Sequence, residues 1–289
     1  MTRKEFVEQL KETVKAELAD KGYEVSLVNV NKVSEAYLGL NVKKDGTMAS
    51  PVYNMDKAWL EYMKTEDLDG IAEEIIEMTM KNDVTIDFDF SNYEAVKDRL
   101  FVRASNIESN GGFLKNVPFR KTCDLALTCH IDFGKKGHTM MSAVITKDML
   151  KRFGVTEDQL LDDAIGNTKK TKPAMIKTLY GTVCELSGQD YDAAADVPVF
   201  VLTNRETIFG APVLFYDGVM EMIGKKLGNF YVLPSSVHET LIMKDDGQDA
   251  KSLAEMVRSV NRSEVKPEER LSDHVYHYDC ETGKLTVAA

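Results

Sequence analysis

The N-terminal residues show the clearest helical pattern of the chain. Apolar side chains recur at every fourth residue, which places them on one face of an α-helix. Thr2 and Glu5 have the spacing of a capping box, and Gly22 suits the end of a helix. The pattern therefore predicts a helix over residues 3–21. Its apolar face would consist of Phe6, Leu10, Val14 and Leu18.

Strand patterns and two further helical patterns follow this helix. Residues 24–31 and 36–42 alternate between apolar and polar side chains, as paired strands do, and a third short strand is predicted near residues 50–53. Helical periodicity returns at residues 56–64 and 68–81. We expect a helix packed on a small antiparallel sheet, followed by two acidic helices.

The strongest hairpin pattern lies at residues 125–133 and 139–146, which flank the turn sequence GKKGH. Side chains alternate along a strand, so the apolar residues from Leu125 to Ile131 would share one face. Thr128, His130 and Asp132 would then point the other way. We interpret that second face as an exposed hairpin surface.

The C-terminal half mixes helical and strand patterns. Helices are predicted at residues 147–153, 156–165, 173–186, 218–226 and 249–261, and strands at residues 197–202, 212–216, 230–233, 237–243 and 275–278. Pro234 separates two strands that we expect at the centre of a sheet, because proline cannot donate to a strand ladder. Residues 275–278 would form an edge strand.

These patterns predict an α+β protein. A small N-terminal unit of helix and antiparallel sheet, with the acidic helices, would span residues 1–108. A C-terminal domain at residues 113–289 would hold a larger mixed sheet that contains both the hairpin and the strands at 197–243. The sequence SNGG at residues 109–112 is a loop signal between them. The two parts could also form one domain.

Composition narrows the class of protein. With 289 residues and 43% hydrophobic residues, the chain can bury a substantial core. It has no long apolar segment and no apolar leader, so we expect a soluble, cytoplasmic protein without a membrane contact. Four irregularly spaced cysteines favour reduced thiols, with Cys129 and Cys184 buried. The absence of nucleotide-binding glycine motifs argues against a cofactor.

The net charge of −11 argues against direct binding to nucleic acid, which requires a positive field. The negative charge is concentrated between residues 55 and 98, whereas residues 115–177 are net positive. Glu73, Glu74 and Glu77 would project together from the helix at 68–81. This acidic surface is either a solvated helix face or a mimic of a phosphate backbone.

Ser235, Ser236, His238 and Glu239 supply the hydroxyl, imidazole and carboxylate groups that nucleophilic catalysis uses. However, no GxSxG elbow and no glycine-rich oxyanion loop accompanies them. We interpret these residues as parts of a turn, and a serine hydrolase as the alternative.

Two further clusters carry candidate chemistry. His130, Asp132 and His138 could ligate a metal ion through imidazole and carboxylate groups, although two histidines near one turn are a weak signal. Arg205 lies between two apolar strands, where a loop could present it to an anion. The alternative for that loop is a structural salt bridge.

Three runs of the chain carry a family resemblance. FYVLPSSVHETLIM begins at Phe230, VKPEERLSDHVYHYD spans Val265 to Asp279, and VLTNRETIFGAPVLFYDGVMEMI spans Val201 to Ile223. Together they resemble the C-terminal signature of uncharacterised proteins of anaerobic Firmicutes, known as a domain of unknown function. The resemblance implies a bacterial host and supplies no catalytic residues.

We therefore expect a cytosolic binding or regulatory protein without catalysis, with a protein partner as one possibility. The alternatives are a serine- or metal-dependent hydrolase, and an acidic decoy for a nucleic-acid-binding protein that a mobile element would encode. Converging polar groups in a cleft would favour the hydrolase, whereas carboxylates along one face would favour the decoy. The ligand and the oligomeric state are left open by the sequence.

Overall fold

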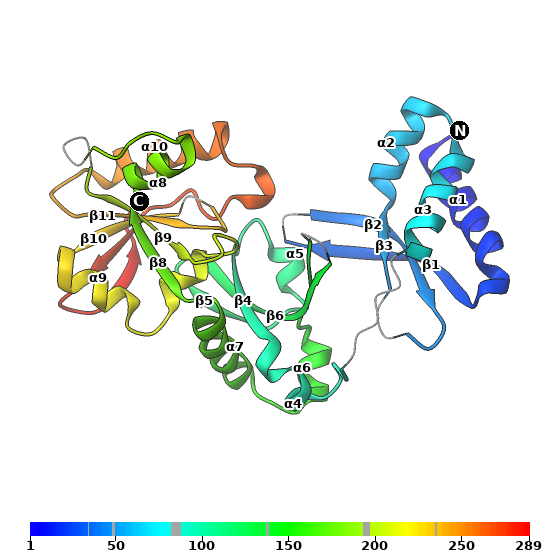
Figure 1. The fold of residues 1–289 in the computed structure, drawn as a ribbon, viewed down its shortest axis with the longest axis horizontal. Coiled ribbons are helices and arrows are strands. Elements are labelled where there is room, and N and C mark those ends of the chain that lie inside the picture. The colour runs from blue at the N-terminus through cyan, green and yellow to red at the C-terminus, as the bar shows by residue number, and fades with distance from the viewer. Residues whose placement is uncertain (34, 48–49, 82–87, 137–138, 193–196, 235) are drawn as a thin grey trace. The chain divides into compact units, whose positions relative to one another are not determined.

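The computed structural model describes residues 1–33, 35–47, 50–81, 88–136, 139–192, 197–234 and 236–289. The chain forms two compact units, which we call unit 1 (Met1–Asp87) and unit 2 (Phe88–Ala289). Each unit has its own hydrophobic core and is described separately (Figure 1).

Unit 1 is a small α+β unit. Its elements are α1 (Arg3–Leu18), β1 (Tyr23–Lys32), β2 (Glu35–Lys44), β3 (Val52–Asn54), α2 (Met55–Thr65) and α3 (Leu68–Lys81). The strands follow one another in an antiparallel sheet of order β1-β2-β3. The predicted capping box is present, because Thr2 accepts from the Glu5 amide and Glu5 accepts from the Thr2 amide. A short 3-10 turn continues α1 to Gly22, which has a φ of 71°.

The core of unit 1 confirms the predicted apolar face of α1. Phe6, Leu10, Val14 and Leu18 are all fully buried. They pack with apolar side chains of β1 and β2 and with α2 and α3. The ring of Phe6 lies 5.3 Å from that of Trp59 and 4.9 Å from that of Tyr62, so α2 closes one end of this core with aromatic contacts.

The first sheet of unit 2 is built around one long strand. Its strands are β4 (Leu100–Asn106), β5 (Phe119–Thr122), β6 (Leu125–Lys136) and β7 (Thr139–Val144). β6 pairs with each of the other three, always antiparallel. The accompanying helices are α4 (Tyr93–Val96), α5 (Gly111–Leu114), α6 (Lys147–Phe153) and α7 (Glu157–Thr171).

The second sheet of unit 2 has the order β13-β12-β10-β11-β9-β8. Its strands are β8 (Ala174–Thr178), β9 (Val199–Asn204), β10 (Phe230–Leu233), β11 (Thr240–Lys244), β12 (Tyr276–Asp279) and β13 (Lys284–Val287). The remaining elements are α8 (Leu179–Ser187), α9 (Val219–Leu227), α10 (Ala250–Ser263) and a 3-10 helix, η3 (Ala211–Phe215). The prediction that the two strands around Pro234 are central is confirmed, because β10 and β11 occupy the middle of the order.

Both sheets of unit 2 share one core. Leu125, Leu127, Cys129 and Ile131 of β6 are buried together, as the alternation predicted, and α7 packs on them. The same core continues through Val232 and Ile242 of the second sheet and through α9. A polar contact also joins the first sheet to α7, because the Val102 amide of β4 donates to Thr168 Oγ1 of α7 at 3.0 Å.

A hydrogen-bonded cluster fastens the C-terminal strands to the first sheet. The hydroxyl of fully buried Tyr276 donates to Asp124 Oδ1 at 2.5 Å, and Ser272 donates to Oδ2 at 2.7 Å. His274 Nδ1 lies 3.1 Å from Oδ2. Although burial opposes the change, these bonds lower the pKa of the Asp124 carboxyl. Asp124 therefore holds β12 as a charged acceptor.

The predicted α+β class is confirmed, but the single mixed sheet is wrong. The hairpin lies in the first sheet of unit 2 and the strands at 197–243 lie in the second, and every described pair is antiparallel. The expected edge strand at 275–278 is covered on its outer side by β13. The loop at 109–112 lies inside unit 2, since β4 before it pairs with β6 after it.

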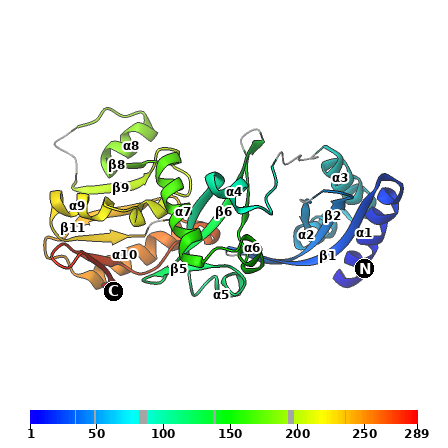
Figure 2. The ribbon, with the colours of Figure 1, turned by 90° about the horizontal axis from the view of Figure 1, so that it is seen from below.

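Two local predictions also fail for identifiable reasons. The strand predicted at 212–216 is replaced by η3 and its C-cap, because Pro212 cannot donate to a strand ladder. The amides of Val213 and Tyr216 instead donate to the carbonyls three residues earlier, at Gly210 and Val213. The helix predicted at 173–186 begins only at Leu179. Thr178 caps it by accepting from the Gly181 amide, and the residues before that cap form strand β8 (Figure 2).

Candidate functional site

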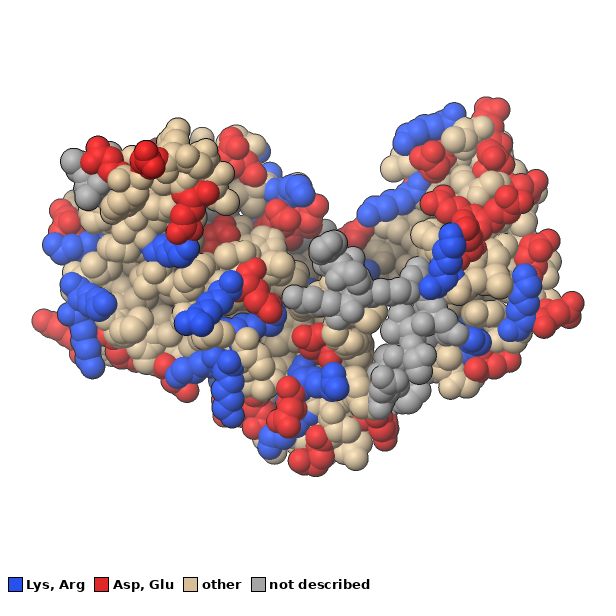
Figure 3. All heavy atoms as spheres, in the orientation of Figure 1, with Lys and Arg blue, Asp and Glu red and all other residues tan. Residues whose placement is uncertain are grey.

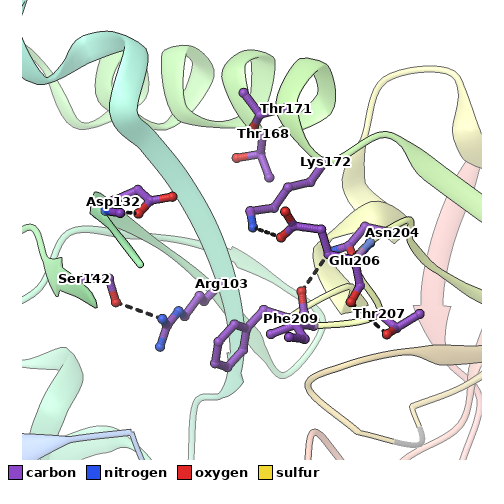
Figure 4. Close-up of polar contacts among 12 residues, drawn as sticks. Arg103, Asp132, Ser142, Thr168, Thr171, Lys172, Asn204, Glu206, Thr207 and Phe209 are labelled. Carbon is purple, nitrogen blue, oxygen red and sulfur yellow. Dashed lines mark hydrogen bonds and ion pairs between the residues drawn. The ribbon is translucent and has the colours of Figure 1, made fainter. Parts of the chain in front are cut away.

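Arg103 is the most unusual charged residue of unit 2. It lies on β4, where its neighbours Val102 and Ala104 face the core and its own side chain faces the other side of the sheet. The guanidinium lies 3.8 Å from the ring centroid of Phe209 and 5.2 Å from that of Phe101. Its Nη2 donates to Ser142 Oγ at 2.9 Å (Figure 4). Two aromatic rings and one hydroxyl thus hold the cation.

The guanidinium of Arg103 has no carboxylate within ion-pair distance among the described residues. Its Nε is buried and donates to no described acceptor. Ser105 lies two residues further on the same face of β4, and its Oγ is also buried without a described hydrogen-bond partner. Burial lowers the pKa of Arg103 to about 10, while the nearby charge of Asp132 opposes the shift. Arg103 therefore stays charged at neutral pH in a poorly solvated place.

A second cation lies near the same aromatic side chains. Lys172, which follows α7, is only 7% exposed, and its Nζ donates to Glu206 Oε2 at 2.5 Å. The same ammonium lies 5.7 Å from the ring centroid of Phe101. Figure 4 shows Lys172 and Glu206 pointing toward each other near Phe209. Lys172 therefore has its own counter-ion, which distinguishes it from Arg103.

The loop after β9 carries Phe209 in a strained conformation. Thr207 and Phe209 have φ values of 56° and 50°, in the left-handed region that non-glycine residues seldom adopt. Bonds on both sides hold the loop, since Asn204 Nδ2 donates to the Ile208 carbonyl and the Phe209 amide donates to His238 Nδ1. A Cβ on Gly210 would meet the His238 carbonyl at 2.5 Å. The loop therefore fits its surroundings closely.

His130 is buried, so the prediction of an exposed hairpin face is wrong at this position. The side chain is 5% exposed, its ring packs 5.4 Å from that of Phe101, and Nε2 lies 3.0 Å from Thr128 Oγ1. Burial and the positive charge of Arg103 hold the pKa of His130 well below its usual value. The imidazole is therefore neutral, and it adds an uncharged wall to the Arg103 site.

The structure brings two of the three candidate metal ligands to one region. His130 and Asp132 are two residues apart on β6, and Asp132 Oδ1 accepts from the Gly134 amide at 2.7 Å. His138 lies outside the described residues. Within the described part of the chain, His, Cys, Asp and Glu side chains form no group of three that could hold a metal ion.

The candidate hydrolase residues lie at a turn beside the Phe209 loop, and Ser235 is outside the described residues. Ser236 Oγ donates to Glu239 Oε1 at 2.7 Å and accepts from the His238 amide at 3.0 Å. The His238 ring contacts Phe209, and Nε2 lies 3.7 Å from Glu269 Oε1. Among described contacts, the Ser236 hydroxyl and the imidazole share no hydrogen bond. The imidazole is thus not placed to take the proton of Ser236.

The anion candidate of the sequence analysis, Arg205, lies on the loop that carries Phe209 but differs from Arg103 in exposure. Arg205 is exposed, and its amide donates to the Pro173 carbonyl at 3.1 Å. The neighbouring Glu206 makes the salt bridge to Lys172. Sequence reasoning missed Arg103, although one signal was visible: a single arginine interrupts the apolar run from Leu100 to Ala104.

The acidic residues of unit 1 lie where helical geometry placed them. Glu73, Glu74 and Glu77 are exposed on α3, whereas Ile71 and Ile75 are buried. Glu77 forms an ion pair with Lys81. Figure 3 shows acidic side chains over this unit with basic side chains between them. The carboxylates therefore share an exposed side, and part of their charge is neutralised locally.

Fold and site together define an α+β protein of two units, with an arginine-centred polar site in the larger one. The chain belongs to a family of unknown function (DUF5688), whose model matches residues 3–280. The predicted membership in a family of unknown function is thus confirmed. No curated protein and no solved structure matches the chain. None of the described helices has the length and apolar character needed to cross a membrane.

Proposed function

We propose that the protein is a non-catalytic binding protein that recognises an anionic group of its ligand through Arg103. The observation that carries this proposal is a half-buried guanidinium whose Nε is buried without an acceptor, and which forms no ion pair among the described residues. A charge without an ion pair in a poorly solvated place is costly, and charged residues perturbed in this way cluster at functional sites. A carboxylate or a phosphate would supply the missing charge.

The surroundings of Arg103 support recognition of a planar or tetrahedral anion. A guanidinium offers several donors in a rigid fork, which suits two-point contact with carboxylate or phosphate oxygens. Phe209 and Phe101 pack against that fork, and Ser142 Oγ accepts one hydrogen bond from it. Because His130 is neutral and Lys172 is paired with Glu206, Arg103 would supply the positive charge of the site.

Absence of catalysis is supported by the turn at Ser236. Nucleophilic catalysis needs the base within hydrogen-bond reach of the nucleophile. In this turn the hydroxyl instead donates to Glu239, and His238 Nδ1 accepts from the Phe209 amide. The Ser236 side chain is thus engaged within its own turn, and the His238 side chain joins that turn to the Phe209 loop. That use fits a rigid binding site better than a hydrolase.

Thermal unfolding with two simple anions tests the proposal. A ligand at about 10 mM with a Kd of about 1 mM would raise the free energy of unfolding by about 1.4 kcal/mol. We expect inorganic phosphate or succinate to raise the melting temperature of the wild type but not that of Arg103→Met. Arg120→Met is the matched control, because Arg120 lies on the same sheet and already pairs with Asp162 at 2.9 Å.

Two results would contradict the proposal. One is a ligand-induced shift that persists in Arg103→Met, which would place the anion elsewhere. The other is the lack of any shift with either anion in the wild type, with sodium chloride of equal ionic strength as the reference. Circular dichroism should show that Arg103→Met folds, since methionine fills a similar volume and removes an unpaired charge.

A further inference from the structure

The second sheet of unit 2 ends in a strand whose outer edge has no described partner. β8 is the last strand in the order, and it pairs with β9 from Ala174 opposite Asn204 to Thr178 opposite Phe200. The bond from the Arg205 amide to the Pro173 carbonyl fixes which residues face β9. In an antiparallel pair these alternate, so the backbone groups of Ala174 and Ile176 point away from the sheet.

Exposure agrees with this assignment of the edge. Ala174 is exposed and Ile176 is 40% exposed, and no described side chain or backbone group bonds to their amides or carbonyls. Figures 1 and 2 both show β8 beside β9 at the margin of the sheet. A free edge of this kind is a template for an added strand.

An apolar groove adjoins this edge. It has a volume of about 210 Å³ and lies between the sheet and α9. On the sheet side it is lined by Ile176, Thr178 and Phe200, and on the helix side by Met222, Ile223 and Leu227, with two lysines completing it.

The groove is the uncovered end of the main core. Phe200 and Leu202 lie on the face of the sheet that α9 covers. Leu202 is buried in the core, and Phe200 is partly buried against it. At the edge this cover is incomplete, so Met222 is 44% exposed. A strand added to β8 would place every second side chain in this groove.

The charge around the groove indicates the chemistry of the partner. Lys177 and Lys226 line it, and no carboxylate does. Lys177 is bound to Glu185, which leaves Lys226 as the groove cation without a described ion pair. A second copy of the chain would bring the same lysines against each other. An acidic partner would be attracted to them.

We propose that β8 and the adjoining groove bind an extended acidic peptide of another protein by strand addition. Its backbone would pair with Ala174 and Ile176, its alternate apolar side chains would enter the groove, and a carboxylate would meet Lys226. Main-chain bonds supply affinity in this mode, and the groove supplies side-chain preference. The inference does not depend on the Arg103 site.

Fluorescence anisotropy with defined peptides tests this inference on the full chain. The probe is a blocked, labelled peptide of about six alternating valine and glutamate residues, long enough for one strand. The comparison peptides replace glutamate by lysine, or the central valine by proline. We expect the valine–glutamate peptide to bind, and both replacements to weaken binding at least about tenfold.

Variants of the protein locate the binding. Ile176→Pro removes one outward donor, and proline is tolerated at an edge because the bonds to β9 are kept. Lys226→Glu reverses the groove charge, and Lys225→Glu makes the same change on α9 outside the groove lining. We expect the first two to weaken binding at least about tenfold and the third to have a smaller effect. Amide resonances of Ala174 and Ile176 should shift when the peptide binds.

Three outcomes would overturn the proposal. The peptide fails to bind the wild type at millimolar concentration, or it binds Ile176→Pro and Lys226→Glu as tightly as the wild type. Alternatively, sedimentation equilibrium shows a dimer that Ile176→Pro abolishes, which would identify a second copy as the occupant. Should Ile176→Pro fail to fold, Lys226→Glu and the amide shifts still decide the question.

Discussion

Replacing His130 by glutamine should make the free energy of unfolding of unit 2 less sensitive to acid. Burial and the charge of Arg103 hold the pKa of His130 well below the ordinary value of 6.5. The native state therefore keeps the imidazole neutral at a pH where the unfolded chain protonates it. Between those two pKa values the unfolded state binds more protons, so the free energy of unfolding falls as the pH falls.

The size of this effect follows from the ordinary pKa alone. Each pH unit below 6.5 costs about 1.4 kcal/mol until the native pKa is reached, and above 6.5 the contribution is constant. Between pH 7.5 and 5.5, His130 should therefore lower the free energy of unfolding by about 1.4 kcal/mol. His130→Gln should reduce the difference between the two pH values by that amount.

Urea unfolding followed by circular dichroism at both pH values measures this difference. Trp59 is the single tryptophan and belongs to unit 1, so its fluorescence separates the unfolding of that unit. Thr128→Val is the matched control, because it removes the hydrogen-bond partner of His130 and leaves the buried imidazole. An unchanged pH difference in His130→Gln, or an equal loss of it in Thr128→Val, would refute the reasoning.

Gly210→Ala should destabilise unit 2 by about 1–3 kcal/mol in urea unfolding, since the added Cβ would press on the His238 carbonyl; a neutral result would mean that the loop moves freely. Thr2→Ala should cost about 1 kcal/mol in the unfolding of unit 1, because the capping box is lost, whereas Thr2→Ser should preserve it. In thiol titration of native protein, exposed Cys280 should react first and buried Cys129 last, and denaturation should bring the total to four; fewer than four would contradict the prediction of reduced thiols.

The sequence predicted best where one face of an element meets one core. The spacing of Phe6 to Leu18 identified α1, and the alternation in β6 identified its buried side, because in both cases burial follows a single local period. Burial of Cys129 and Cys184 was predicted correctly as well. These elements need no knowledge of distant residues beyond the existence of a core.

Features that depend on contacts between distant residues could not be predicted in the same way. The second face of β6 is covered as well, so His130 is buried against Phe101, a contact that alternation does not contain. Phe209 has a left-handed φ although it is not a glycine, so the sequence does not predict this turn. The turn nevertheless places the Phe209 ring against the Arg103 guanidinium. The predicted helix at 173–186 included β8, because a strand of five residues is too short to show a clear alternation of apolar and polar side chains. The candidate site therefore emerged mainly from the structure.

The bond between Tyr276 and Asp124 has a consequence for folding during synthesis. The sheet of unit 1 joins strands that are neighbours in the sequence, so it can form early, as local topologies do. Unit 2 differs, because its core needs the buried ring of Tyr276, and the acceptor of that hydroxyl is made 152 residues earlier. While the ribosome adds those residues, the core that β6 and α7 share with Tyr276 is incomplete, and some of its apolar side chains stay exposed. A chaperone that binds nascent chains should therefore meet unit 2 far more often than unit 1.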